Sequence, residues 1–312
     1  MATRSRFPVD RGLTARMLTT VFLLGLLYAV FVTVLVLLHV QLAFILVLAF
    51  GILFVQYFFS DKIALYSMGG KVVTREQEPH LHAVVDRLVA MANMPKPTVA
   101  VAQTDIPNAF ATGRDQKHAV VCVTYGLLRR LDEPEVEAVL AHELSHVAHR
   151  DVAVMTIASF LGILAGLLTR VLAYAGLFGG FGGGNRNNNN NAGGQLVLIE
   201  MGMLVVSAVI YAISFILIRT LSRYRELAAD RSGAILIGQP AILASALVKV
   251  SGEMSRIPTR DLRAAEHFNA FYFAPALAQG ASLSSLFATH PPLQKRLDQL
   301  ARLDAEMHRG AA

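Results

Sequence analysis

The 312-residue chain has one cysteine and few charged residues. Cys122 alone excludes a disulfide within the chain, and the apolar stretch around it, AVVCVTYG, predicts a strand with a buried thiol. Charged residues make up 16% and hydrophobic residues 54%, a balance outside that of soluble domains. The formal net charge is +6, but no long run of basic residues occurs, which argues against nucleic-acid binding. The composition therefore indicates a membrane protein.

Two N-terminal segments, residues 17–38 and 40–59, contain no charged residue. Because about 20 helical residues cross a bilayer core, each segment is long enough to span it. The first is longer than the apolar region of a cleaved signal peptide and the second follows at once. We therefore expect residues 1–59 to form a transmembrane hairpin that stays in the mature protein.

A second apolar hairpin is predicted for residues 152–218, from uncharged residues 152–169 and from residues 196–218, which include Glu200. This hairpin either spans the bilayer or only dips into it, since a carboxylate deep in lipid is costly. Between its two helices, the Gly- and Asn-rich residues 176–194 predict a disordered connecting loop.

The arginines near the N-terminus set the expected orientation. Arg4, Arg6, Arg11 and Arg16 precede the first span, so the N-terminus is predicted to be cytoplasmic. With four spans, residues 60–151 and 219–312 both lie in the cytoplasm. We expect these two segments to form the two parts of one catalytic domain.

A helix that starts at Asp132 is predicted for residues 131–151, LDEPEVEAVLAHELSHVAHRD. In HELSH, His142 and His146 lie four residues apart on one helix face, where both imidazoles can bind one zinc ion. Glu143 stands beside them, where it can accept a proton from water. The alternative is a surface helix with solvated histidines.

His149 lies on the same helix face, but about 10 Å from His142 along the axis, too far to share one ion. We predict that it is a cap or interfacial residue. No HxxGxxH spacing follows, which excludes the metzincin class.

A catalytic zinc needs a third protein ligand. Glu226 in RTLSRYRELAADRSGA is the candidate, and Asp230, one turn later, can orient a ligand histidine through its second ring nitrogen. The alternative is a solvated helix face, on which this spacing is common.

Further motifs accompany HELSH in order along most of the chain: PNAFATG at residues 107–113, VTYGLL, SRYRELAAD, and THPPLQKRL at residues 289–297. This pattern resembles the HtpX-type membrane zinc metalloproteases, gluzincins related to the CAAX prenyl endopeptidases. The resemblance implies a mainly α membrane protein with four transmembrane helices and a cytoplasmic gluzincin-like α+β metalloprotease domain. Leu227 departs from the aromatic residue that is commoner after the glutamate, which affects packing rather than metal binding.

The resemblance also assigns roles to individual residues. It implies one Zn²⁺ per chain with His142, His146 and Glu226 as ligands, Glu143 as the general base, and Asp230 as the carboxylate behind a ligand.

Two further segments each allow two interpretations. Asn108, Ala109 and Phe110 look like the edge-strand motif that binds substrate backbone, or else form a polar turn beside a core phenylalanine. His290 either donates a hydrogen bond to the developing oxyanion, supported by Arg296, or belongs to a helix start.

The resemblance implies an endopeptidase that cleaves misfolded membrane proteins or unfolded polypeptides at the cytoplasmic face of a bacterial inner membrane, in protein quality control and the stress response. The alternatives are a CAAX-type prenyl-protein endopeptidase and a metal transporter or sensor without hydrolytic activity. Transport would place ionisable ligands near the middle of the spans, where only Glu200 qualifies even loosely.

Overall fold

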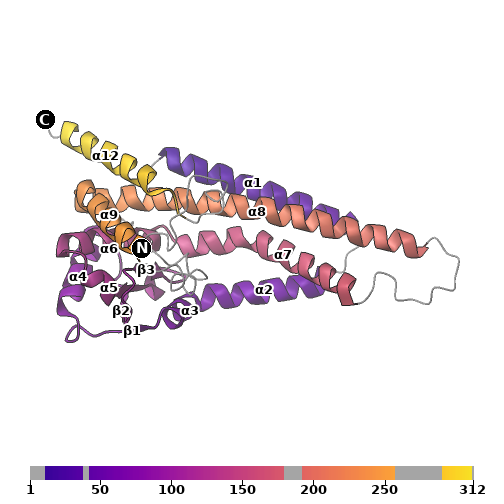
Figure 1. Cartoon of the computed structure of the whole chain (residues 1–312), viewed down its shortest axis with the longest axis horizontal. Coiled ribbons are helices and arrows are strands. Elements are labelled where there is room, and N and C mark those ends of the chain that lie inside the picture. The colour runs from indigo at the N-terminus through magenta and orange to yellow at the C-terminus, as the bar shows by residue number, and fades with distance from the viewer. Residues whose placement is uncertain (1–10, 38–41, 179–191, 257–289, 311–312) are drawn as a thin grey trace. The chain divides into compact units, whose positions relative to one another are not determined.

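The computed structural model describes residues 11–37, 42–178, 192–256 and 290–310 (Figure 1). These residues fall into two compact units. Among the described residues, the globular unit consists of residues 11–17, 56–154, 219–256 and 290–310, and the apolar unit of residues 18–37, 42–55, 155–178 and 192–218. The elements, in chain order, are α1 (Arg11–Leu37), α2 (Leu42–Phe58), α3 (Ser60–Ser67), β1 (Gly70–Val72), α4 (Pro79–Ala92), β2 (Thr98–Ala102), β3 (Ala109–Thr112), η1 (Gln116–His118), β4 (Val120–Thr124), α5 (Tyr125–Leu128), α6 (Glu133–Ala148), α7 (Asp151–Phe178), α8 (Ala192–Ile237), α9 (Pro240–Arg256) and α12 (Leu293–Gly310).

The globular unit contains a mixed sheet of four short strands in the order β1-β2-β4-β3. β2 and β4 are parallel, and the two outer pairs are antiparallel. Every residue of β4, VVCVT, is buried, as a β-branched run predicts for an inner strand. Burial raises the pKa of the Cys122 thiol to about 12, so the prediction of a strand with a buried thiol is confirmed.

The main core of the globular unit lies between the sheet and its helices. Val121 and Val123 of β4 join a buried cluster with Leu88 of α4 and Leu140 and Leu144 of α6. Each fully buried side chain of this size stabilises the fold by about 1.5–3 kcal/mol. α9 packs against α6, and α12 packs against α9. The sheet and these helices form a packed frame around α6, the helix that carries HELSH.

The apolar unit contains helices that are long and apolar enough to cross a membrane. Within the described residues, three such spans are present, Arg11–Leu37, Asp151–Arg170 and Met201–Ile237. Ala49–Phe58 is a shorter apolar helix, so the predicted second span, residues 40–59, is not confirmed. The expected count of four spans therefore stays a prediction, although the membrane character of the chain does not depend on it.

The predicted second hairpin is formed by α7 and α8. Two glycines of α7 lie against α8: Gly162 faces Ile218 and Gly166 faces Tyr211, with room for only a small residue. The helices extend into the predicted loop, since α7 ends at Phe178 and α8 begins at Ala192, and residues 179–191 lie outside the described part of the chain. The side chain of Glu200 also lies outside it.

Candidate active site

Local sequence forms α6 as expected. Asp132 is the N-cap, its backbone N–H donates to the Glu135 carboxylate at 3.0 Å, and Pro134 stands in the first turn. The predicted start of this helix is confirmed. Glu135 is buried and also accepts hydrogen bonds from Ser245 and Lys249 of α9, at 2.8 Å each. These contacts fix α6 to the next helix of the frame.

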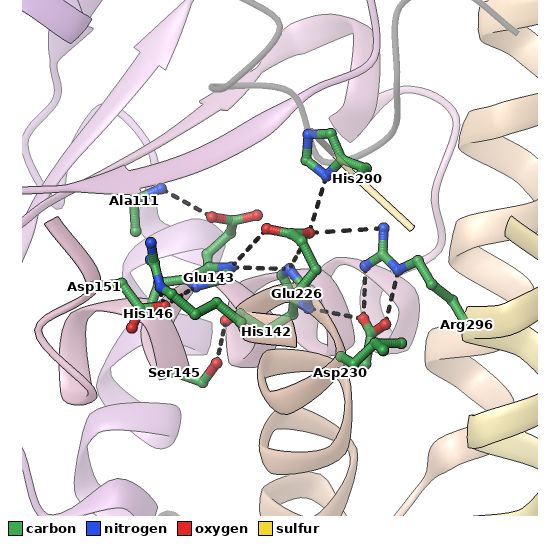
Figure 2. A network of polar contacts seen from close by, with 12 residues as sticks. Ala111, His142, Glu143, Ser145, His146, Asp151, Glu226, Asp230, His290 and Arg296 are labelled. Carbon is green, nitrogen blue, oxygen red and sulfur yellow. Dashed lines mark hydrogen bonds and ion pairs between the residues drawn. The ribbon is translucent and has the colours of Figure 1, made fainter. Parts of the chain in front are cut away.

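His142, His146 and Glu226 come together as one group of potential metal ligands (Figure 2). Nε2 of His142 lies 3.3 Å from Nε2 of His146. The Glu226 carboxylate lies 3.4 Å from His146 Nε2 and 3.7 Å from His142 Nε2. Metal–ligand bonds of about 2.1 Å in tetrahedral geometry place neighbouring donors about 3.4 Å apart. The donor set and its spacing therefore fit a zinc ion.

A glycine allows α8 to bring Glu226 to this position. Gly233 lies two helical turns after Glu226, and a Cβ there would stand 2.7 Å from the backbone nitrogen of His142. Helix periodicity and metal-ligand spacing did not predict a role for Gly233. The available signal was a lone glycine inside a helix, on the same face as Glu226 and Asp230.

Asp230 lies behind His142, where the sequence argument expected a carboxylate. Its Oδ1 is 2.9 Å from Nδ1 of His142, which leaves Nε2 turned toward Glu226. Arg296 donates two hydrogen bonds to Asp230, at 2.6 and 2.7 Å (Figure 2). Arg296 thus contacts the carboxylate behind His142, and its support of His290 stays a prediction.

Asp151 is the corresponding partner of His146, and the sequence pattern did not predict this role. Nδ1 of His146 is hydrogen-bonded to Oδ2 of Asp151, the first residue of α7 (Figure 2). This contact leaves Nε2 of His146 turned toward His142 and Glu226.

Glu143 is buried next to the three potential ligands. Its carboxylate accepts a hydrogen bond of 3.0 Å from the backbone N–H of Ala111 in β3. Burial raises the pKa of Glu143 to about 8, against the opposing effects of His146 and the Ala111 hydrogen bond, while the Glu226 carboxylate acts in the same direction as burial. A carboxyl group that titrates near neutral pH suits a general acid or base.

The NAF motif lies where the chain enters β3, one of the two edge strands of the described sheet. The side chains of Asn108, Ala109 and Phe110 are all buried, and Phe110 packs with Cys122 on the sheet face away from the main core. Their burial agrees with the interpretation of Phe110 as a core residue, while substrate binding by this segment stays a prediction.

His290 reaches the site from the segment before α12. Its Nδ1 lies 3.0 Å from Oε2 of Glu226, and its other ring nitrogen points away from that carboxylate (Figure 2). Pro291 and Pro292 stand immediately before α12, as expected for a helix start. The predicted helix start is confirmed, and the oxyanion role of His290 stays a prediction, with its imidazole beside Glu226.

His149 is the C-cap of α6, and its Nδ1 lies 2.8 Å from the Ser145 carbonyl oxygen. It is absent from the potential metal ligands found among the described residues. This placement agrees with a capping residue.

Comparisons with known proteins agree with this geometry. Residues 75–304 match the model of peptidase family M48. The chain is 56% identical to the Protease HtpX homolog 1 of Streptomyces coelicolor, with 97% of each chain covered. It is 52% identical to the Protease HtpX homolog of Moorella thermoacetica, with 97% of this chain and 98% of that one covered.

A solved structure shares the fold. The crystal structure of S. mikatae Ste24p matches with a TM-score of 0.56 and 17% sequence identity, over 93% of this chain and 67% of that chain. Metalloproteases of family M48 are in general zinc-dependent, and the group of His142, His146 and Glu226 could bind such an ion. The chain belongs to peptidase family M48 and is a membrane metalloprotease.

Proposed function

We propose that the protein is a zinc-dependent endopeptidase in which His142, His146 and Glu226 hold one zinc ion and Glu143 is the general base. The observation that carries the proposal is the three-donor group with Glu143 buried beside it. When bound there, zinc supplies a Lewis acid that polarises a peptide carbonyl and lowers the pKa of water.

The protein's own residues supply the remaining steps. Glu143 accepts the proton of the attacking water and passes it to the leaving amine, in keeping with a pKa near 8. His290 donates a hydrogen bond to the carbonyl oxygen as negative charge develops there, which requires it to release Glu226 or to use its second nitrogen. An extended peptide pairs with the edge of β3, beside Ala111, whose N–H contacts Glu143.

We further propose that the substrates are misfolded or damaged membrane proteins and unfolded polypeptides, cleaved at the cytoplasmic face of a bacterial inner membrane during quality control and stress. Two features support this assignment. Apolar helices precede and follow α6 in the chain, and four arginines, Arg4, Arg6, Arg11 and Arg16, precede the first span.

The chemistry is tested with detergent-purified protein by measuring zinc content and cleavage of casein. Glu143→Gln keeps all three proposed ligands, so we expect about one zinc per chain in both proteins and a loss of about 100- to 10,000-fold in turnover. His142→Ala should lose both zinc and cleavage. Cleavage by Glu143→Gln at the wild-type rate would refute the assignment of the base.

The orientation is tested with a single engineered cysteine. Burial and a raised pKa protect the native Cys122 from thiol reagents, so Lys295→Cys on exposed α12 reports its own side of the membrane. A membrane-impermeant maleimide should label this variant only after the cells are permeabilised. Labelling of intact spheroplasts would place this domain outside the cytoplasm.

A further inference from the structure

Each of the two potential histidine ligands has a carboxylate behind it, and each carboxylate contacts an arginine. Behind His142 stand Asp230 and Arg296. Behind His146 stand Asp151 and Arg225, whose Nη2 lies 2.6 Å from Oδ2 of Asp151. Both sets therefore run from histidine to aspartate to arginine. The first set comes from α6, α8 and α12, and the second from α6, α7 and α8.

The Asp151 set is built to hold its position. The side chains of Asp151 and Arg225 are only 9% and 11% exposed, so their ion pair is largely protected from solvent. Nε of Arg225 is buried and has no hydrogen-bond partner among the described residues. The Arg225 guanidinium is paired with Asp151 through Nη2. A buried arginine of this kind strongly favours a carboxylate in one fixed place.

The backbone between His146 and Asp151 is also unusual. Arg150 has a φ of 56°, in the left-handed region, where it follows the C-cap His149. Glycine commonly occupies such a position after a helix, and a residue with a Cβ costs about 1–2 kcal/mol there. This turn ends α6 and starts α7 at Asp151, which brings the carboxylate back to His146. A costly conformation at this junction is consistent with a functional demand on the position of Asp151.

We infer that Asp151 and Arg225 form a positioning pair for His146: Arg225 fixes the Asp151 carboxylate, which accepts the Nδ1 proton and thereby directs Nε2 toward the metal. A carboxylate behind a ligand histidine selects its tautomer and orients its ring. The inference rests on the proposed zinc site. The inference adds that His146 is oriented by Asp151, the first residue of α7, and through it by Arg225 of α8.

The test measures zinc affinity by competition with a chelator and the absorption spectrum of the cobalt-substituted protein, beside casein cleavage. Asp151→Asn and Arg225→Gln should each weaken zinc binding, Asp151→Asn by about 10- to 100-fold, and change the cobalt spectrum. Because Arg225 acts through Asp151, the double variant should bind zinc no more weakly than Asp151→Asn. Each single variant leaves the other member of the pair buried and charged, which can itself destabilise the fold. The double variant removes both charges, so a loss of zinc affinity in it does not come from a buried unpaired charge.

Arg223→Gln is the matched control, because Arg223 lies on the same helix and donates to Thr220. It should keep the wild-type zinc affinity and cobalt spectrum. Wild-type zinc affinity in either Asp151→Asn or Arg225→Gln would overturn the pair, as would fully additive losses in the double variant. If wild-type protein itself bound no zinc, the proposed function would fail instead, so the two failures are distinguishable.

Discussion

Gly233 of α8 lies against the backbone of His142 in α6. A Cβ at position 233 would be 2.7 Å from the nitrogen and 2.9 Å from the Cα of His142. Both atoms belong to a fully packed helix, so they cannot move aside without moving the imidazole. This close approach explains how α8 brings Glu226 within 3.7 Å of His142.

Replacing Gly233 with alanine should therefore separate the potential ligands. We expect Gly233→Ala to lose most of its zinc and about 1–3 kcal/mol of stability, the usual cost of an added methyl group in a packed interior. Zinc content and denaturant unfolding provide the measurements. Wild-type zinc content and stability in this variant would show that α6 and α8 are not in contact as described.

Gly252→Ala in α9 is the matched control for this prediction. A Cβ at Gly252 would meet nothing within 4 Å. Since alanine is the better helix former, the control should keep its zinc and gain about 0.5–1 kcal/mol of stability.

Local sequence patterns predicted those parts of the site that depend on one element. The start of α6, the spacing of its two histidines and the strand around Cys122 follow from capping and periodicity within about 20 residues. Gly233 and Asp151 could not be predicted in this way. Their roles depend on how closely α8 approaches α6 and on a left-handed turn at Arg150, where the sequence offers no glycine.

The N–H of Ala111 should tune Glu143. In β3 it donates to Glu143 rather than to β4, so Ala111→Pro removes this hydrogen bond without removing a bond of the sheet. A hydrogen bond to a carboxylate stabilises its ionised form, so its loss raises the pKa of Glu143. The acid limb of the kcat/KM profile should move to higher pH, by about one unit.

Ala111→Ser keeps the N–H and is the matched control. Its acid limb should stay at the wild-type pH, even if the added hydroxyl changes KM. An unshifted acid limb in Ala111→Pro would mean that this N–H does not act on the ionised form of Glu143.

Zinc binding should strengthen as the pH rises, because His146 must lose a proton to bind the metal. Burial alone would lower the pKa of His146, but the carboxylates of Asp151 and Glu226 outweigh it and raise the pKa to about 10. Burial lowers the pKa of His142, which therefore releases no proton near neutral pH. Glu143, whose pKa of about 8 would add a second titration in this range, is removed in Glu143→Gln, so in that variant log affinity should rise by about one per pH unit between about pH 6 and 8. Chelator competition across this range measures the slope, and a zinc affinity independent of pH would show that His146 is already neutral when it meets the metal.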